Sequence, residues 1–269
     1  MQKAVKSCFI DNKDTVKSYF ATNKEKLLSF IPDIPWDKIM FYLSSHINKN
    51  DTLLKCSRIS IFEVFRKAVS MNLNLDPSYG EVSFVPYWNN IKKIYEAELI
   101  PGYKAFIRVA HEIYDAKIFA GTFTYDDIEN RYFTGYDAIA KQITIDGAKF
   151  QSVKIKTRDN ISNIWVSIQT DDRKIDHLYS KEEIEERARY LDKIKLSSPW
   201  NSKLRKTDYE EMLKKTAIKH SLKLMPWPEI LKISEIDNKA EEKILPKQDK
   251  KDIKKYFPDL NIEGDKYSF

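Results

Sequence analysis

The sequence predicts an α+β fold: N-terminal helices, a central twisted antiparallel β-sheet with hairpins packed on helices, then C-terminal helices and a mobile tail. Three observations lead to this prediction. Apolar side chains recur at helical spacing in roughly the first 50 residues, alternate with polar ones in the middle of the chain, and return to helical spacing after residue 180. Helices and strands segregated in this way are typical of an α+β domain rather than a parallel sheet.

Helical signals dominate the N-terminal part. Two helices are expected at 14–30 and 36–47, because the prolines within 31–35 interrupt the pattern between them. A third helix begins at Ser60, which forms a capping box with Glu63 three residues later. This helix stops before Pro77, because the residue ahead of a proline is disfavoured in the α conformation.

Runs of β-branched and aromatic residues predict the strands of the central part. Asp146–Gly147 and Asp171–Asp172 mark two turns between them, and Pro101–Gly102 ends the second strand. A helix with one apolar face follows at 103–114. The predicted strands are 81–87, 93–100, 117–125, 131–134, 142–155, 163–169 and 174–178.

The C-terminal part returns to helices. Ser180 and Glu183 form a second capping box, which opens a charged helix to about Lys195, and a loop at 197–200 leads to a helix at 208–225. After Pro228 the chain is rich in charged and poor in apolar residues, so we expect a loosely held tail that serves protein partners rather than DNA. The expected regions are therefore a helical region at 1–50, a core at 51–230 and a charged C-terminal tail at 231–269.

Several classes of function lack their motifs. None of the six glycines belongs to a phosphate-binding loop, which excludes a P-loop ATPase. The two cysteines and four histidines have no metal-ligand spacing, and the cysteines are expected to be reduced thiols. No apolar run approaches the ~18 residues of a membrane span, and the first residues lack the apolar segment of a secretory signal. We therefore expect an intracellular protein without catalytic residues.

A carboxylate-bound Mg²⁺ site stays open as an alternative. Asp126, Asp127 and Glu129 lie together, as do Asp171 and Asp172. The plainer interpretation of both groups is a solvated turn between strands. If the first group binds metal, the chain would instead be a metal-dependent DNA nuclease. A third alternative is an adaptor whose affinity for DNA is incidental.

Positive charge is clustered within the part expected to fold. The whole chain has a formal net charge of +6, from 46 Lys and Arg against 40 Asp and Glu. The segment 195–223 has eight basic and three acidic residues, and the segment 141–158 has five basic residues and one acidic residue. Such clusters beside aromatic residues suit a phosphate backbone, although a solvated lysine-rich surface would have the same composition.

Six short segments form a series along the chain. They are 65–80 (FRKAVSMNLNLDPSYG), 82–86 (VSFVP), 99–110 (LIPGYKAFIRVA), 198–200 (SPW), 210–219 (EEMLKKTAIK) and 224–226 (LMP). In this order they resemble the RecT family of phage-type single-strand annealing proteins, over about residues 50–228. The chain departs from the family pattern at 87–90, where the family has a turn rich in glycine or lysine. It also departs at Ala105, often a glycine in the family, and at His220, a basic residue in the family.

The resemblance implies an ATP-independent protein that coats single-stranded DNA and pairs it with a complementary strand. It implies no cofactor; Mg²⁺ could assist annealing, but the sequence identifies no protein site for it. The implied partners are single-stranded DNA, the annealed duplex, further copies of the chain in a ring or helical filament, a phage exonuclease and a host single-strand binding protein. Subunit contacts are expected from residues 1–50 and annealing from 51–230, in the cytoplasm of a bacterial or phage-infected cell.

The candidate DNA-binding residues are cations and aromatic residues within or near these segments. Annealing favours contacts to phosphate and sugar, because the base edges must stay open to the second strand. Lys104 and Arg108 lie on the helix face opposite the apolar stripe, with surface ion pairs to Glu112 or Asp115 as the alternative. The expected DNA-binding residues are Tyr103, Lys104, Arg108, Lys154, Lys156, Arg158, Trp200, Lys214, Lys215 and Lys219.

Some of these candidates have a competing structural role. Tyr103 could stack on a base, but it begins the apolar stripe, so we favour the core. Lys154, Lys156 and Arg158 alternate along a strand, as either a basic ladder for DNA or an ordinary exposed sheet face. Trp200 is a base platform or a plug beneath its loop, and we favour the plug.

The helix predicted at 208–225 combines an apolar and a basic stripe. The stripe expected to face the core is Tyr209, Leu213, Ala217, His220 and Leu224, with Ile218 and Leu222 flanking the basic stripe. Lys215, Lys219 and Lys223 form the basic stripe, which we expect to line a groove; the alternative is a surface pair of Glu211 with Lys215. If Lys215 and Lys219 each neutralise a phosphate, changing both to alanine should reduce the salt dependence of binding by about 1.4 in log–log slope without altering stability.

Overall fold

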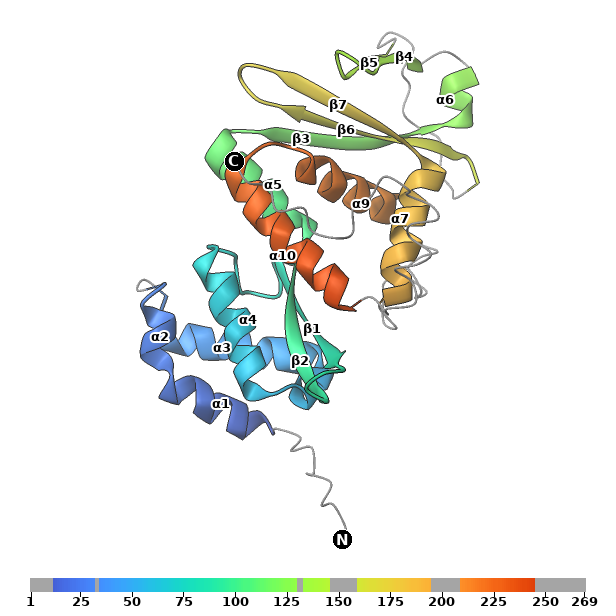
Figure 1. The fold of residues 1–269 in the computed structure, drawn as a ribbon. Coiled ribbons are helices and arrows are strands. Elements are labelled where there is room, and N and C mark those ends of the chain that lie inside the picture. The colour runs from blue at the N-terminus through green and yellow to red at the C-terminus, as the bar shows by residue number, and fades with distance from the viewer. Residues whose placement is uncertain (1–11, 32–33, 130–132, 146–158, 195–208, 245–269) are drawn as a thin grey trace, which may run out of the picture.

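The structure described here is a computed structural model (Figure 1). The described residues are 12–31, 34–129, 133–145, 159–194 and 209–244. They form helices and small antiparallel sheets, so the α+β prediction is confirmed. The single central sheet that we expected is instead three separate sheets within the described residues, one of three strands and two of two strands each.

The N-terminal helices lie together at one end of the molecule (Figure 1), and they pack around a cluster of phenylalanine rings. Phe20 packs edge-on against Phe62 and Phe65, with ring centroids 5.2 and 5.3 Å away. All three rings are almost completely buried, and their packing holds the helix that contains Phe20 against the helix that contains Phe62 and Phe65. These elements are α1 (Lys13–Thr22), α2 (Lys24–Leu28), α3 (Trp36–Lys49), the 3₁₀ turn η1 (Asp51–Lys55) and α4 (Arg58–Ser70).

The two predicted capping boxes have different outcomes. α4 begins earlier than expected, because Ser57 accepts the capping hydrogen bond from the amide of Ser60 at 3.3 Å. The hydroxyl of Ser60 instead accepts from the amide of Ala97 in the neighbouring hairpin, at 3.0 Å. At the second box, the hydroxyl of Ser180 accepts from the amide of Glu183 at 3.1 Å, which confirms the start of α7 (Lys181–Ile194).

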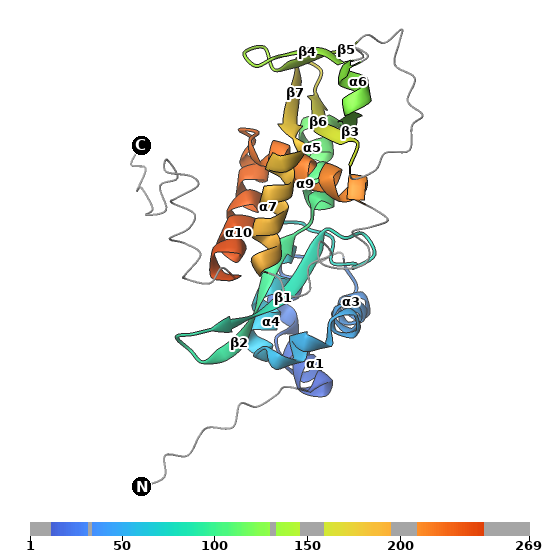
Figure 2. The same cartoon turned by 90° about the vertical axis from the view of Figure 1, so that its right-hand side faces the viewer.

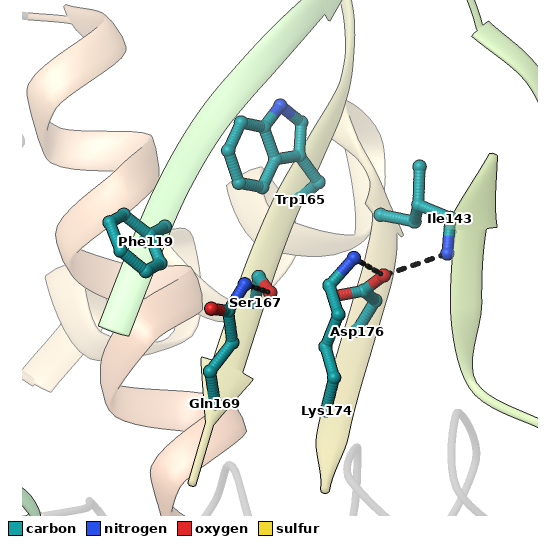
Figure 3. Close-up of a pocket in the computed structure, with 7 residues that line it drawn as sticks. All are labelled: Phe119, Ile143, Trp165, Ser167, Gln169, Lys174 and Asp176. Atoms are coloured by element: carbon teal, nitrogen blue, oxygen red, sulfur yellow. Dashed lines mark hydrogen bonds and ion pairs between the residues drawn. The ribbon is translucent and has the colours of Figure 1, made fainter. Parts of the chain in front are cut away.

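The three-stranded sheet packs one face on α9 (Tyr209–Lys223) (Figure 2). β3 (Lys117–Thr124), β6 (Ile161–Gln169) and β7 (Lys174–Ser180) pair antiparallel, and the predicted turn at 171–172 joins the last two. Ile164, Val166 and Ile168 point from β6 toward the helix and are buried. Phe119 and Trp165 lie on the opposite face (Figure 3).

Further elements complete this half of the molecule. α5 (Tyr103–Tyr114) leads into β3, and a short helix α6 (Tyr125–Glu129) replaces the solvated turn that we expected after it. β4 (Phe133–Asp137) and β5 (Gln142–Ile145) form a two-stranded sheet, in which β5 contacts β7. The hairpin turn predicted at 146–147 lies outside the described residues.

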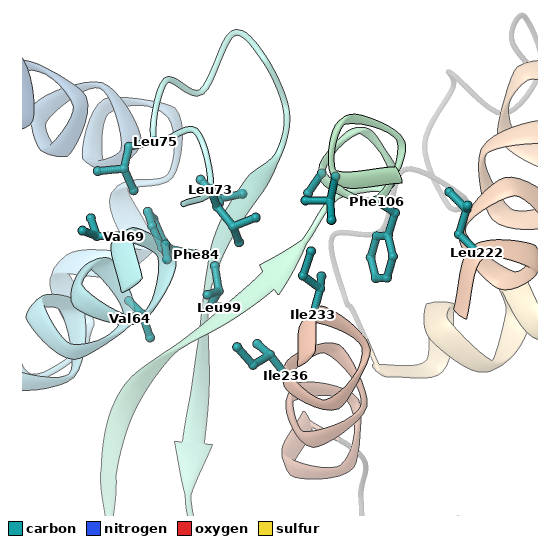
Figure 4. Close-up of a cluster of buried hydrophobic side chains, with 14 of the residues drawn as sticks. Val64, Val69, Leu73, Leu75, Phe84, Leu99, Phe106, Leu222, Ile233 and Ile236 are labelled. Carbon is teal, nitrogen blue, oxygen red and sulfur yellow. The ribbon is translucent and has the colours of Figure 1, made fainter. Parts of the chain in front are cut away.

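The β1–β2 hairpin is held between two helices (Figure 4). β1 (Val82–Asn89) and β2 (Ile94–Pro101) are antiparallel, and Phe84 lies opposite Leu99 in their register. Val64 of α4 approaches this pair from one side, and Ile233 and Ile236 of α10 (Pro228–Ile244) lie on the other side of β2. All five side chains are buried, so the hairpin is part of the main core rather than an appendage.

The prediction of a loosely held tail after Pro228 is wrong for residues 228–244. They form α10, and its buried residues Ile230, Ile233, Ile236 and Ala240 recur at helical spacing. The high charge of the segment concealed this stripe, because a helix needs only one apolar face to pack. Residues 245–269 lie outside the described residues, and the boundaries proposed for the three regions stay predictions.

The apolar stripe of α9 is confirmed over its first turns. Tyr209, Leu213 and Ala217 are buried, whereas Leu224 is 54% exposed because α9 ends at Lys223. Leu222, which flanks the basic stripe, is fully buried. The helix contacts the sheet on one side and α5, α7 and α10 on others, so it is packed on several sides.

We predict that His220 makes the protein less stable in mild acid. Burial, together with the positive charges of Arg187, Lys223 and His177, lowers the pKa of His220 to about 3. A depressed pKa stabilises the folded protein above the unfolded value of 6.5, and this stability is lost as pH falls toward 3. The free energy of unfolding, measured by urea titration at several pH values, should therefore fall by at most about 1.4 kcal/mol per pH unit from this residue.

The variant His220→Gln isolates this contribution. Its stability should depend less on pH between 6 and 4.5 than that of the wild type, because glutamine does not titrate. His111→Gln is the control, since His111 lies exposed on α5, and it should keep the wild-type dependence. Equal pH dependence of all three proteins would contradict the prediction.

Candidate nucleic-acid interface

The N-terminal end of α5 lies where two glycines meet. Gly102 is the N-cap residue, no side chain caps the helix, and its first turn contains no acidic residue. A Cβ atom at Gly102 would lie 2.1 Å from the carbonyl oxygen of Gly80, so the close approach of the two backbones requires glycine. The N–H group of Ala105 donates to the carbonyl oxygen of Gly102 at 3.0 Å, whereas the N–H groups before it have no acceptor one turn back in the helix. These groups and the helix dipole favour an anion at this end.

Two lysines add positive charge at this end. Lys104 is exposed on the first turn of α5, and within the described residues no hydrogen bond or ion pair engages its ammonium group. Lys215 reaches from α9 and holds its ammonium nitrogen 5.9 Å from the centre of the Tyr103 ring. The structure thus brings together three of the sequence-predicted residues, Tyr103, Lys104 and Lys215, which we call the α5–α9 basic site.

Tyr103 lies partly in the core, as we favoured, and its stacking on a base stays a prediction. Its ring is half-buried, so it belongs partly to the packing between α5 and α9, and Lys215 covers one face. Burial, and secondarily the carboxylate of Glu211, raises the pKa of its hydroxyl group above the usual value. The hydroxyl is therefore protonated at neutral pH and available as a hydrogen-bond donor.

Lys214 is paired on the surface of its own helix. Its ammonium group contacts the carboxylate of Glu211 closely and lies 3.9 Å from that of Glu210. The alternative pair of Glu211 with Lys215 is therefore wrong: the carboxylate of Glu211 is turned toward Lys214, three residues away. This leaves Lys215 without a carboxylate partner in the described chain.

Lys219 and Lys223 bind a buried carboxylate. Asp237 of α10 is completely buried, and its two oxygens lie 2.7 Å from the ammonium of Lys219 and 2.5 Å from that of Lys223. Burial alone would raise the pKa of Asp237, but the two ammonium groups hold it below its usual value. The side chain of Lys219 is only 19% exposed and is bound to Asp237, and a contact of Lys219 with DNA stays a prediction.

Arg108 is engaged on all sides by its own protein. Its guanidinium donates to Glu81 at 2.7 Å, to Glu112 at 2.6 Å and to the carbonyl oxygen of Asn72 at 2.5 Å. The side chain is 24% exposed, and although burial opposes its charge, the two carboxylates raise its pKa above the usual value. The ion pair with Glu112 that the sequence offered as an alternative is therefore confirmed. The contact of Arg108 with DNA stays a prediction. A phosphate there would compete with Glu81, Glu112 and Asn72 for the same guanidinium hydrogens.

The comparison with known families adds the decisive observation. A sequence profile of the RecT family matches residues 37–252, which is most of the chain. The chain belongs to the RecT family. A search of curated proteins finds no match.

Family membership assigns the chain to phage-type single-strand annealing in DNA recombination. RecT proteins are annealing proteins rather than classical enzymes. The match includes α5, α9 and the loop before α5, so the whole α5–α9 basic site lies within the family region.

None of the described helices is both long and apolar enough to cross a membrane.

Four of the DNA-binding candidates lie outside the described residues, although they are within the RecT match. These are Lys154, Lys156, Arg158 and Trp200. Their predicted roles, as a basic ladder and as a platform or plug, stay predictions.

Each of the two acidic clusters considered for a metal site contains a carboxylate with another partner. Asp127 accepts hydrogen bonds from the amide and hydroxyl of Thr124, at 2.7 and 2.8 Å, and so caps α6. Asp172 accepts from the hydroxyl of Thr170 at 2.5 Å in the turn between β6 and β7. Among the described residues, no three His, Cys, Asp or Glu side chains are arranged to hold a metal ion. The cluster therefore lies in the helix α6, with Asp127 capping it, rather than in the solvated turn that we expected.

We predict that Asp237→Ala strongly destabilises the protein. Removing the carboxylate leaves two largely buried ammonium groups, of Lys219 and Lys223, without their counter-charge, which costs about 3–5 kcal/mol. Chemical denaturation measures this loss. The control is Glu235→Ala on the same helix, whose 71% exposed side chain pairs with Lys239 and which should change stability by less than about 1 kcal/mol. Similar stabilities of the two variants would show that the buried ion pairs do not hold α10.

Proposed function

We propose that this protein binds single-stranded DNA through its phosphates, without ATP, and pairs it with a complementary strand. The observation that carries the proposal is the RecT match over residues 37–252. It is supported by the α5–α9 basic site, where a helix N-terminus and two lysines without carboxylate partners in the described chain coincide. Such a site attracts phosphate and ignores the identity of the base.

The chemistry of annealing requires no bond to be made or broken. Two DNA strands repel each other, so cations that neutralise the backbone of the first strand lower the barrier to the approach of the second. Because Lys104 and Lys215 contact phosphate in this proposal, the base edges remain open for pairing. The sequence information then comes from base pairing alone.

We also propose that the protein works as an assembly. One chain of 269 residues can shield only a few nucleotides, so several copies along the strand are needed to hold a stretch long enough to test for complementarity. The expected assemblies are rings or helical filaments, with subunit contacts from residues 1–50. A phage exonuclease would supply the single strand, and a host single-strand binding protein would compete for it, in the cytoplasm of a bacterial or phage-infected cell.

We predict that the double variant Lys104→Ala/Lys215→Ala binds single-stranded DNA with a weaker salt dependence. Each phosphate contact contributes about 0.7 to the slope of log K against log salt, so the slope should become shallower by about 1.4. Affinity should fall equally for all base sequences, because phosphate contacts carry no base information. Stability should change by less than about 1 kcal/mol, since neither lysine has a carboxylate partner in the described chain.

The control variant removes the same charge elsewhere. Lys55→Ala/Lys232→Ala takes one exposed lysine from η1 and one from α10, both outside residues 1–50, and should leave the slope unchanged. An equal slope in both double variants would contradict the assignment of the α5–α9 basic site. A shortened oligonucleotide product that requires Mg²⁺ and disappears with a chelator would instead favour the nuclease alternative. Annealing that fails without ATP would contradict the ATP-independent proposal.

A further inference from the structure

The outer face of the three-stranded sheet contains a hollow with an aromatic wall (Figure 3). Its volume is about 320 Å³, and it lies on the face opposite α9, bordered by β5. Phe119 of β3 and Trp165 of β6 form the apolar side, and the Phe119 side chain is 49% exposed. Trp165 is half-buried. Aromatic rings on the open face of a sheet are stacking surfaces for flat aromatic ligands.

The position of the Trp165 indole ring depends on a glycine in the neighbouring strand. Gly121 lies directly opposite Trp165 in the antiparallel register. A Cβ atom at Gly121 would come within 2.7 Å of the indole ring, so the ring lies against the bare backbone of β3. A larger residue there would lift the indole away from the sheet and into the hollow.

The polar side of the hollow contains an incompletely bonded carboxylate. Asp176 of β7 is 1% exposed, and its Oδ2 atom accepts from the amide of Ile143 at 2.8 Å and from the ammonium of Lys174 at 2.9 Å. Its Oδ1 atom is buried and has no hydrogen-bond donor within the described residues. Leaving a buried carboxylate oxygen without a donor is costly, so an unmet acceptor beside a hollow indicates a ligand that donates.

The backbone around Asp176 holds this carboxylate in place. The hydroxyl of Tyr136 donates to the carbonyl oxygen of Asp176 at 3.1 Å, and the amide of Asp176 donates to the carbonyl oxygen of Lys141 at 2.7 Å. These bonds tie β7 to the β4–β5 hairpin. Ser167 and Gln169, which also line the hollow, are joined to each other by a hydrogen bond of 3.3 Å. The acceptor is therefore preorganised, as a binding site requires.

We propose that this hollow binds one unpaired nucleobase with an exocyclic amino group, from single-stranded DNA. The base would contact Trp165 and Phe119 with its ring face, donate its amino hydrogen to Oδ1 of Asp176, and accept from Lys174. Adenine and cytosine present an amino group beside a ring acceptor, and guanine beside ring N–H and carbonyl groups. Thymine has no amino group, and its single N–H lies between two carbonyl oxygens that a carboxylate repels.

This inference rests on the proposed function and adds a second kind of contact to it. The α5–α9 basic site holds phosphate, whereas the hollow lies across the sheet from α9 and holds a base. A cytosine that donates an amino hydrogen to Asp176 and accepts from Lys174 at its ring nitrogen N3 uses its Watson–Crick edge, so pairing with a complementary strand withdraws it. The hollow therefore favours unpaired over paired DNA.

The test compares oligonucleotides of equal length by fluorescence anisotropy with the full chain. The probes are oligo(dC), oligo(dT) and an abasic oligonucleotide that retains the phosphates. Trp165→Leu should weaken oligo(dC) binding by about fivefold or more, the range for one stacked base, and leave abasic binding and the salt slope unchanged. Phe119→Ala should act in the same direction, and because this ring is half exposed, its loss leaves the core intact.

Two further variants complete the test. One removes the amino-group contact and keeps the stacking rings, and the other removes a tryptophan that lies elsewhere. The wild type should bind oligo(dC) more tightly than oligo(dT), because only cytosine has an amino group for Asp176. Asp176→Asn keeps an acceptor for the amide of Ile143 but replaces the other oxygen with an amino donor, so this preference should disappear. Trp88→Leu removes a 42% exposed tryptophan from the β1–β2 hairpin, away from the hollow, and should bind all three probes like the wild type.

The outcomes distinguish the hollow from the proposed function. If the wild type binds oligo(dC) and abasic DNA equally, or if Trp165→Leu and Phe119→Ala bind oligo(dC) like the wild type, the base site is wrong while phosphate binding stands. An unchanged oligo(dC) preference in Asp176→Asn overturns the amino-group contact. If the Trp165 and Phe119 variants change the size of the assembly but not the affinity for any probe, the hollow is a contact between protein subunits and the base site is wrong. A wild type that binds none of the probes would contradict the proposed function itself.

Discussion

Asp237 is buried between α9 and α10, and its carboxylate binds the ammonium groups of Lys219 and Lys223. The rest of the fold depends on this contact, because α10 packs on the β1–β2 hairpin as well as on α9 and α5. A two-stranded hairpin is marginal by itself in water, and the hairpin is stabilised by the helices on either side of it. At the far end of α10, Lys243 pairs with Glu98 of the hairpin at 2.6 Å. Sliding α10 would separate these charges in a poorly solvated interior, which makes other alignments costly.

The same ion pairs decide which cations remain for DNA. Counting charges along 195–223 suggests a broad basic surface, but Lys214 and Lys219 in this segment already have carboxylate partners, as does Arg108 on α5. Lys104 and Lys215 differ from them because no carboxylate engages them in the described chain. Their coincidence with the start of α5 concentrates positive potential at one place. The net charge of +6 is therefore a poor guide to the interface, and the pairing pattern is a better one.

The proposed phosphate and base contacts lie on different sides of one sheet. The face toward α9 is apolar and buried, and it fixes the helix from which Lys215 extends. The outer face carries Phe119, Trp165 and the partly bonded Asp176. Because side chains alternate along a strand, packing the inner face determines which residues point outward. The core of the sheet thus positions both kinds of contact without belonging to either.

Short-range patterns determined much of the secondary structure. The hydroxyl of Ser180 caps α7, the turn at 171–172 joins β6 to β7, and Gly102 ends a strand before α5, as their local sequences predict. These signals work because capping and turn formation involve residues within about four positions of each other. The same locality led to errors: Ser60 has the pattern of a cap, but its hydroxyl binds the distant amide of Ala97.

The candidate site could be predicted only in part for the same reason. The sequence identified Tyr103, Lys104 and Lys215 as candidates from their residue types and the RecT resemblance, but it could not separate them from Arg108 and Lys219. That distinction depends on carboxylates far away in the chain, since Asp237 lies 18 residues beyond Lys219 and Glu81 lies 27 residues before Arg108. Likewise, alternation within a strand shows which residues share a face with Phe119 or with Trp165. Only the register of β3 against β6 and the approach of β5 bring the two rings beside Asp176. Local sequence determined the elements and the kinds of residue available; tertiary structure decided which charges are neutralised, because electrostatic and packing energies depend on distance in space rather than along the chain.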